Sequence, residues 1–246
     1  MSIVARLTWM EMKLFFRDKQ NVFWTFLFPI LMIWLFGSLF GDQRMPGGLS
    51  YSNMYVPSWI GVNLLTTALF TIGTALVMYR VQGILRRYQA TPLRPQMVLG
   101  AHMLCGAFVF LVSALILAGF GWVFYDLEAP KYPGSVAAAL LLSVLALFPF
   151  GMFVTSLARD NRSAAAIGSL LLNLMLFLSG ATFPLEMMPS YLQTAAKILP
   201  LYYVVELLRG TWNKAPLWDY GIHVAVLAGI AIVSGILAAR FFRWGD

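Results

Sequence analysis

Six stretches of the chain are long, apolar and free of Asp, Glu, Lys and Arg, except that the last one ends at Arg240. A transmembrane helix needs about 20 predominantly apolar residues, because each residue of an α-helix adds about 1.5 Å along its axis. All six stretches meet this requirement. The sequence therefore predicts an all-α integral membrane protein whose six transmembrane helices lie at about 22–41, 53–79, 97–124, 135–158, 163–183 and 220–240.

Composition excludes the main alternatives to a membrane protein. Charged residues make up 11% of the chain and apolar residues 60%, whereas a soluble domain has about 25% charged residues. This excludes a soluble globular enzyme and a disordered chain. One cysteine, Cys105, and two distant histidines, His102 and His223, do not indicate a disulfide or a metal centre. Residues 1–246 contain no repeat or linker, which indicates a single membrane domain.

Lysine and arginine are unevenly shared between the two sides of the predicted domain. With both termini on one side, that side holds twelve of the 17 basic residues and the other side holds five. Basic residues in short loops are enriched on the cytoplasmic side. We therefore expect a multi-pass protein of the cytoplasmic (inner) membrane of a prokaryote, with both termini cytoplasmic. This topology accounts for the net charge of +7, which then does not indicate a nucleic-acid partner.

The N-terminal segment at 3–19 repeats apolar side chains at helical spacing: Ile3, Leu7, Met10 and Leu14. Basic residues lie to one side of this stripe, a pattern typical of an amphipathic interfacial helix that lies along membrane lipid. Glu11 and Asp18 lie near the stripe and weaken the pattern. The alternative is a basic flank that only fixes the orientation of the chain.

The cytoplasmic loop at 80–94 is more ordered in its residue types than a loop that only fixes orientation. Gly83 is followed by helix formers and then by Thr91-Pro92, and proline cannot continue a helix. We expect a short helix that ends firmly before Pro92. Its apolar face and paired arginines form a plausible binding surface for a soluble partner, made of Ile84, Leu85, Arg86, Arg87 and Tyr88.

The external segment at 183–219 is apolar, unlike an ordinary loop. Its apolar runs are too short to span a membrane, and Pro184, Pro189 and Pro200 interrupt them. We expect two short re-entrant helices that enter the membrane from outside. The transmembrane helices would shield them, because irregular backbone cannot face lipid. The alternative is a loop that lies on the lipid surface.

These last two segments together resemble the ABC-2 type permease family, the membrane subunits of one class of ATP-driven exporters. The resemblance extends over about residues 3–243, and its most specific parts are Ser179-Gly180…Phe183-Pro184…Pro189…Leu192…Leu199-Pro200…Leu208-Arg209 and Gly83…Leu85-Arg86-Arg87…Thr91-Pro92. Many members carry an acidic residue shortly before the loop glycine, where this chain has Arg80 and Gln82. An acid-mediated contact to the ATPase is therefore not expected.

The resemblance implies two partners, an ABC ATPase subunit and a second permease copy. A coupling helix at 83–92 would dock into a separate ABC ATPase subunit, and the 183–209 region would cap the pathway externally. A second permease copy would complete a homodimer or heterodimer. ATP and Mg would be bound by the ATPase, because this chain has no G-x-x-x-x-G-K-[ST] phosphate loop. We expect no cofactor and no metal in the chain itself.

The polar residues within the predicted transmembrane helices are uncharged. One stripe on the second helix consists of Asn63, Thr67, Thr71 and Thr74, and a shorter stripe on the fifth consists of Ser169 and Asn173. The resemblance places these two helices at the dimer axis, which makes the stripes candidates for the translocation path. The alternative is that they hold helices together through interhelical hydrogen bonds. We expect His102 and His223 to be hydrogen-bonded to neighbours near the ends of their helices.

These features predict the permease subunit of an ABC exporter, which has no ATPase site of its own. The mostly apolar interior favours a lipophilic drug-like or lipid-linked substrate. One alternative is a mechanical or assembly subunit that uses the ATPase without transport. Another is a lipid-modifying membrane enzyme, for which the sequence lacks clustered acids, histidines or cysteines. A proton-coupled carrier is disfavoured, because the transmembrane stretches lack the charged residue that such a carrier needs.

Overall fold

The computed structural model describes residues 3–41, 48–84 and 95–241, which form helices and connecting segments without a strand. Within them, six helical stretches are long and apolar enough to cross a membrane: Lys19–Phe40, Tyr51–Val81, Met97–Tyr125, Pro133–Ser156, Asn161–Leu178 and Leu217–Arg240. The predicted all-helical chain with six candidate transmembrane helices is therefore confirmed for these residues. The fifth helix ends before the expected 183, because the chain turns at Gly180, where φ is +81°.

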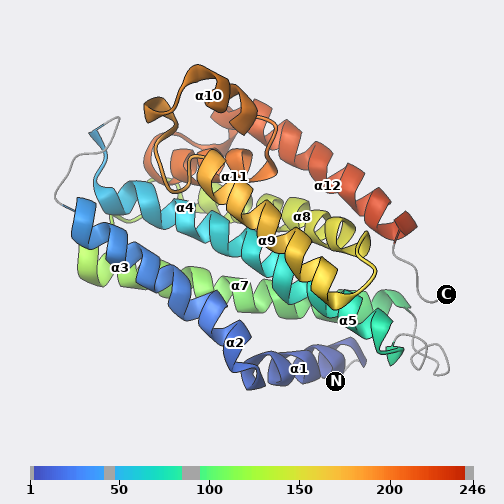
Figure 1. The fold of residues 1–246 in the computed structure, drawn as a ribbon. Coiled ribbons are helices and arrows are strands. Elements are labelled where there is room, and N and C mark those ends of the chain that lie inside the picture. Colours follow the sequence, from blue (N-terminus) through green and yellow to red (C-terminus); the bar gives the residue numbers. More distant parts are fainter. Residues whose placement is uncertain (1–2, 42–47, 85–94, 242–246) are drawn as a thin grey trace.

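The first half of the chain begins with α1 (Ile3–Arg17), which lies across one end of the bundle (Figure 1). The first transmembrane stretch joins α2 (Lys19–Val22), the π-helical η1 (Phe23–Leu27) and α3 (Phe28–Phe40). The second stretch joins α4 (Tyr51–Thr66), the π-helical η3 (Thr67–Thr74) and α5 (Ala75–Val81). The third is α7 (Pro95–Tyr125).

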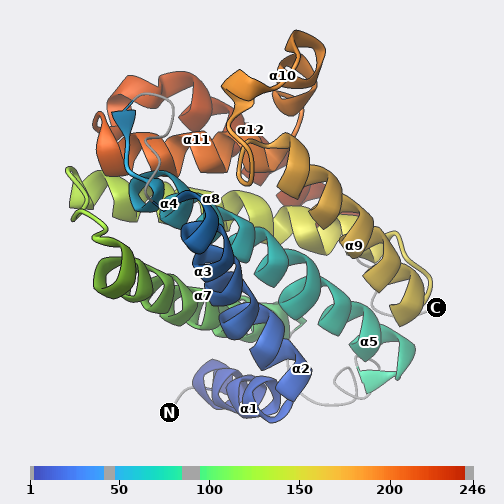
Figure 2. The same ribbon diagram turned by 60° about the vertical axis from the view of Figure 1, so that its left-hand side comes forward.

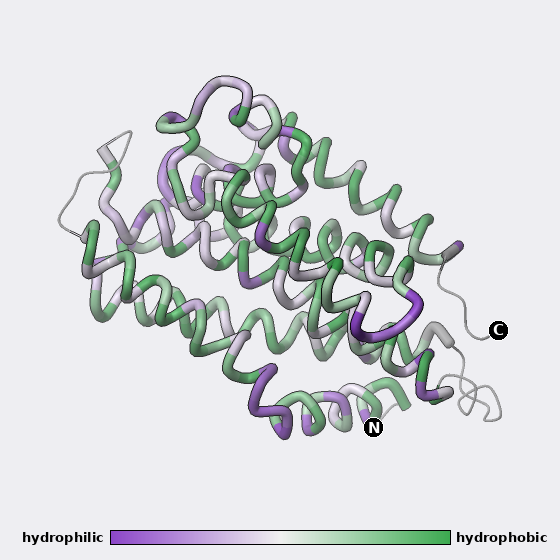
Figure 3. The backbone as a smooth tube through the Cα atoms, in the orientation of Figure 1, coloured by the Kyte–Doolittle hydropathy of each residue, from purple (hydrophilic) through white to green (hydrophobic). Residues whose placement is uncertain are grey.

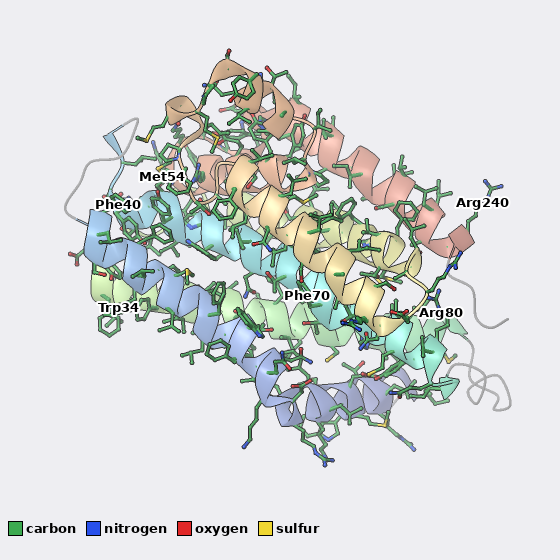
Figure 4. The ribbon with its side chains drawn as sticks, viewed as in Figure 1. Trp34, Phe40, Met54, Phe70, Arg80 and Arg240 are labelled. Atoms are coloured by element: carbon green, nitrogen blue, oxygen red, sulfur yellow. The ribbon has the colours of Figure 1, made fainter. Side chains whose placement is uncertain are left out.

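The second half contains α8 (Pro133–Ser156) and α9 (Asn161–Leu178), the fourth and fifth stretches. Three short elements follow: η4 (Leu185–Met187), α10 (Ser190–Ala196) and α11 (Pro200–Asn213). The sixth stretch joins η5 (Leu217–Tyr220) and α12 (Gly221–Phe241). Arg80 and Arg240 lie at the same end of the bundle as α1, which we call the α1 end; α10 lies at the opposite α10 end (Figures 1 and 4).

The second transmembrane stretch forms the centre of the bundle. In its most apolar window 72% of the residues are buried within the protein, against 17% in the fifth and sixth stretches. α4 contacts α3, α7, α8, α9 and α11, and Figure 2 shows it between α3 and α9. α4 carries polar side chains, among them Ser58 and Asn63, which are fully buried between helices and away from lipid. Hydrophilic residues also gather at the α1–α2 junction and the α8–α9 connection (Figure 3).

Small residues allow η3 and α8 to approach each other closely. A Cβ atom added to Gly151 of α8 would lie 2.4 Å from the carbonyl oxygen of Ala68, and one added to Gly73 would lie 2.6 Å from Thr155 Oγ1. Small residues at helix contacts let membrane helices gain van der Waals packing. These two glycines therefore set the spacing between the second and fourth transmembrane helices.

Replacing Gly151 with alanine is expected to destabilise the protein by about 1–3 kcal/mol, because the new methyl group meets the backbone of Ala68. The higher helix propensity of alanine, about 1 kcal/mol, offsets part of this cost. The matched control is Gly229→Ala in α12, where an added Cβ meets nothing within 4 Å. Thermal unfolding in detergent measures both variants, and equal melting temperatures would contradict the close packing.

A proline in the first transmembrane stretch leaves a carbonyl oxygen that other helices satisfy. Pro29 has no backbone N–H, so the carbonyl of Thr25, four residues earlier, loses its α-helical donor. The Thr25 oxygen instead accepts hydrogen bonds from Asn63 Nδ2 at 2.6 Å and from Ser113 Oγ at 2.9 Å. Side chains of the second and third stretches therefore hold the first stretch in place, as membrane prolines require.

α1 presents two different faces. Glu11 and Phe15 are buried against the bundle, where α1 packs on α7. The rest of its surface carries exposed apolar side chains: Ile3, Trp9, Met10, Leu14 and Phe16. Most of the stripe expected from the sequence therefore faces outward, where it is available to lipid. The location of α1 at the membrane interface stays a prediction.

α11 is packed into the bundle. Its buried apolar residues include Leu201, Val204, Val205, Leu207 and Leu208, and it contacts α4, α8 and α12. Asn213 Nδ2 at its end donates to the carbonyl of Asn53 at 2.7 Å. That carbonyl has no α-helical donor because Pro57 stands four residues later. The expected two helices between the fifth and sixth stretches are α10 and α11; their entry into the membrane stays a prediction.

Candidate functional site

A cavity of about 560 Å³ lies between the first, second and fifth transmembrane stretches. η1 and α3 contribute one wall, α4 and η3 the second, and α9 the third; Figure 2 shows α3 and α9 on either side of α4. Gln20 and Asn21 of α2 belong to its lining at the α1 end. Small-molecule sites have volumes of about 300–1,000 Å³, so this cavity is large enough for an organic substrate or part of one.

The cavity lining combines aromatic rings with uncharged polar groups. The aromatic residues are Trp24, Phe28, Trp59 and Phe70. The polar residues are Gln20, Asn21, Thr25, Thr66, Thr71, Ser169 and Asn173. Among the described residues that line it, none is charged. A charged ligand group would lose its hydration here without gaining an ion pair, so the lining favours neutral or amphiphilic molecules.

Both π-helical turns contribute to the cavity wall. η1 supplies Trp24 and Thr25, and η3 supplies Phe70 and Thr71. π-helical turns are rare and are frequently found at functional sites. Their i→i+5 hydrogen bonds also rotate the residues that follow, so that a stripe assigned on α-helical spacing does not remain on one face.

The polar stripe expected on the second transmembrane helix is divided by η3. Asn63 and Thr67 are fully buried; Asn63 Nδ2 donates to the Thr25 carbonyl, and Thr67 Oγ1 donates to the Asn63 carbonyl. Thr71 contributes to the cavity wall. Thr74 Oγ1 donates to the carbonyl four residues earlier in its own helix. Three of the four side chains therefore bond to backbone, and a role of the stripe in the path stays a prediction.

The shorter stripe on α9 lies at the cavity. Ser169 and Asn173 both line it and both are exposed. Asn173 Nδ2 donates to the Ser169 carbonyl at 2.8 Å, a bond that does not use the amide oxygen of Asn173. On the opposite wall, Trp59 Nε1 is buried and has no hydrogen-bond partner among the described residues. The exposed polar groups of the cavity at this level therefore come from α9.

The expected ATPase-coupling residues begin at Gly83, just after α5. Its φ of +68° is a left-handed conformation that glycine adopts without strain. Arg80 holds the end of α5, because its guanidinium donates to the carbonyl oxygens of Ser156 and Ala158. The other expected coupling residues lie outside the described residues: Leu85, Arg86, Arg87, Tyr88, Thr91 and Pro92.

A buried polar cluster lies near the base of this loop, and the sequence patterns did not predict it. Glu11 of α1 accepts a hydrogen bond from Tyr79 Oη of α5 at 2.8 Å and pairs with His102 Nδ1 of α7 at 3.2 Å. Burial by itself raises the pKa of the Glu11 carboxyl, but the bonds from His102 and Tyr79 outweigh it and lower this pKa below its usual value. We call these three residues the Glu11 cluster. In the sequence, the one sign of this cluster was Glu11 itself, an acidic residue beside the apolar stripe of the N-terminal segment.

The two histidines have different surroundings. His102 belongs to the Glu11 cluster, whereas His223 of α12 packs against the rings of Tyr202, Tyr203 and Tyr220. His102 is thus hydrogen-bonded to neighbours, as expected; Nδ1 of His223 has no hydrogen-bond partner among the described residues. Within residues 3–41, 48–84 and 95–241, no group of three or more His, Cys, Asp or Glu side chains could hold a metal ion.

Prolines mark the helix starts at the α10 end. Pro184 precedes η4, Pro189 precedes α10, and Pro200 is the first residue of α11. The fixed φ of proline suits the first positions of a helix, where its missing N–H costs nothing. Gly180 forms the turn after α9 with positive φ, and Phe183 beyond it is exposed.

Arg209 ties this segment to the bundle. Its Nε donates to the carbonyl of Met54 at 3.2 Å and to Ser58 Oγ at 2.5 Å, and its Nη2 donates to the carbonyl of Gly180 at 2.6 Å. Glu206 lies 3.9 Å from Nη1 on the exposed side. The side chain is buried, so one guanidinium connects α11 with α4 and with the turn after α9.

Comparison with known proteins agrees with this architecture. The profile of the ABC-2 type transporter family matches residues 4–212. The chain is 25% identical over 222 residues to the transport permease YvfS of Bacillus subtilis (strain 168), covering 87% of this chain and 90% of that protein. It is 30% identical over 218 residues to nodulation protein J of Rhizobium leguminosarum bv. trifolii, covering 86% and 82%.

A third relative is the daunorubicin resistance ABC transporter permease protein DrrB1 of Streptomyces coeruleorubidus. It is 24% identical over 252 aligned positions, which cover 98% of this chain and 87% of the relative. The matches extend along the transmembrane stretches and are not confined to one motif. The chain therefore belongs to the ABC-2 type transporter family and is a multi-pass membrane permease.

Proposed function

We propose that this permease is the membrane subunit of an ABC exporter and that its substrate passes through the cavity between η1–α3, α4–η3 and α9. A separate ABC ATPase subunit hydrolyses the ATP. The observation that carries the proposal is the cavity itself, which combines about 560 Å³ of space with an uncharged, partly aromatic lining.

The substrate class follows from the lining. Aromatic rings favour flat or apolar groups, and the hydroxyl and amide groups of Thr71, Ser169 and Asn173 can bond to neutral polar groups. We propose a lipophilic drug-like or lipid-linked molecule without a buried charge. The names of the relatives link one to daunorubicin resistance and another to nodulation, which are properties of those proteins.

The open side of the cavity supports a second permease copy. Ser169 and Asn173 are exposed on a helix of the membrane-spanning type, and polar side chains at that depth favour contact with another helix over contact with lipid. A second copy that packs beside α9 would cover them and enclose the cavity. The pair is a homodimer, or a heterodimer with a related chain.

Filling the cavity tests the proposal. The permease, copurified with its ATPase and reconstituted in lipid vesicles, is screened for compounds that stimulate ATP hydrolysis. Replacing Ala165, which lines the cavity, with tryptophan is expected to reduce substrate stimulation and transport by about tenfold or more, a loss of about 1.4 kcal/mol of binding free energy. Basal ATP hydrolysis is expected to remain.

The control is Ala239→Trp, which places the same ring at an exposed position of α12 outside the cavity. It is expected to transport normally. If no lipophilic or lipid-linked compound stimulates the wild-type complex, the mechanical or assembly role becomes the better explanation. If Ala165→Trp transports as well as the control, the path lies elsewhere.

We also propose that the α1 end is cytoplasmic in a prokaryotic inner membrane, on the distribution of Lys and Arg. Single cysteines introduced in a Cys105→Ser background test this. Positions 44, 131 and 214 are expected to react with an impermeant maleimide in intact cells, and positions 87 and 160 only after permeabilisation. Labelling of position 160 from outside would contradict the proposed orientation.

A further inference from the structure

The Glu11 cluster joins α1 to the two helices that flank the 82–94 loop, α5 and α7. Tyr79 lies two residues before the end of α5, and His102 lies in the second turn of α7. These two helices are the ones that lead into and out of the loop at 82–94. Glu11 of α1 binds both of them, with Tyr79 Oη at 2.8 Å and His102 Nδ1 at 3.2 Å from its carboxylate. All three side chains are buried.

His102 extends the cluster into the transmembrane region. Its Nδ1 faces Glu11, and its Nε2 lies 3.1 Å from the carbonyl oxygen of Thr71. The ring of His102 therefore bridges the carboxylate of Glu11 and the backbone of Thr71. The donation from Tyr79 to the carboxylate favours the ionised form. One rigid ring thus connects α1 directly to η3.

Thr71 is also a cavity residue. It belongs to η3, the π-helical segment that forms part of the second wall, and it lines the cavity itself. Direct hydrogen bonds therefore run from the base of the 82–94 loop to the cavity wall. Burial of Glu11, Tyr79 and His102 restricts the motion of all three side chains in this network.

We propose that the Glu11 cluster is a coupling joint, which transmits displacement of the 82–94 loop to η3 and so to the cavity. The inference rests on the proposed function, in which the ATPase docks on that loop. Glu11, Tyr79 and His102 act as positioning residues: they touch neither ATP nor substrate. When the ATPase moves the loop, α5 and α7 move with it, and His102 moves the backbone at Thr71.

The test separates coupling from folding. His102→Phe keeps a ring of similar size but removes both hydrogen bonds, and Tyr79→Phe removes a single hydroxyl. Glu11→Gln keeps hydrogen-bonding groups in the same place, since a side-chain amide can accept from Tyr79 Oη and can also bond to Nδ1 of His102. Tyr51→Phe is the matched control, a buried tyrosine of α4 that donates one 2.7 Å bond to the Ile33 carbonyl.

Each variant is reconstituted with the ATPase, and transport and ATP hydrolysis are measured in the same vesicles. We expect His102→Phe to hydrolyse ATP at near the wild-type rate while transport per ATP falls about tenfold, since hydrogen bonds to a charged group shift a two-state equilibrium by about that factor. Tyr79→Phe is expected to show a smaller fall in the same direction. Glu11→Gln and Tyr51→Phe are expected to keep the wild-type ratio.

A second readout distinguishes this inference from the proposed function. Hydrogen exchange of the 67–74 amides is measured with and without ATP; we expect ATP to change it in the wild type and in Glu11→Gln but not in His102→Phe. This readout remains informative if no transport is found for the wild type. An unchanged transport ratio in both His102→Phe and Tyr79→Phe, or an ATP response of 67–74 that persists in His102→Phe, overturns the coupling joint. If His102→Phe does not accumulate, Tyr79→Phe decides by the same two readouts.

Discussion

Replacing Arg209 with alanine is expected to destabilise the permease by about 3 kcal/mol or more, because truncating a charged donor leaves buried acceptors without partners. The carbonyl of Gly180 loses its donor from α11, and Ser58 Oγ loses the guanidinium that donates to it, while the carbonyl of Met54 keeps only its bond from Ser58 Oγ among these side chains. The removed side chain also leaves an empty space between α11 and α4. The apparent melting temperature in detergent is expected to fall by about 6–12 °C.

Two further variants give this prediction its contrast. Arg209→Lys keeps the charge, but a single ammonium cannot reproduce the guanidinium's bonds to two different elements, so an intermediate loss is expected. Arg162→Ala removes an exposed arginine near the start of α9 and is expected to change stability by less than about 0.5 kcal/mol. Equal melting temperatures for Arg209→Ala and Arg162→Ala would show that the buried bonds contribute nothing to stability.

Replacing Leu85 and Tyr88 together with alanine is expected to weaken binding of the ATPase about thirtyfold for each 2 kcal/mol lost, since a buried apolar anchor at an interface contributes about that much or more. The sequence places both residues in the loop between the second and third transmembrane helices. Because they are not part of a transmembrane stretch, the melting temperature of the isolated permease is expected to stay nearly unchanged. Copurification of the ATPase at a series of concentrations measures the loss.

Arg86→Ala and Arg87→Ala are expected to act more weakly and mainly at low salt, because exposed charges are screened within about 10 Å at 0.1 M salt. Arg44→Ala, on the opposite side of the predicted topology, is the control and is expected to bind the ATPase normally. If the Leu85/Tyr88 double variant retains its ATPase at wild-type affinity, the loop only fixes orientation and the coupling assignment is wrong.

The sequence by itself determined the class of the protein and the order of its helices. A membrane requires about 20 apolar residues for each crossing, so six uncharged stretches allow few other readings. The sequence also predicted two short helices between the fifth and sixth stretches, where the structure has α10 and α11. These features depend on residues that are close together in the chain, so composition and spacing are enough to predict them.

The cavity and the polar clusters were decided by the tertiary structure. Asn63 and Thr67 bond to backbone carbonyls, whereas Thr71, within the π-helical η3, lines the cavity, although α-helical spacing places all three on one stripe. The aromatic lining carried no signal, because aromatic residues are 15% of the chain and occur in most of its apolar stretches.

Glu11 shows the physical reason most clearly. Its partners Tyr79 and His102 stand 68 and 91 residues away along the chain. A buried carboxylate is tolerated only where donors meet it, and no pattern within α1 indicates which helices will supply them. In the sequence, Glu11 only weakens an apolar stripe. The packing of α1 against α5 and α7 places Glu11 at the centre of a hydrogen-bonded cluster.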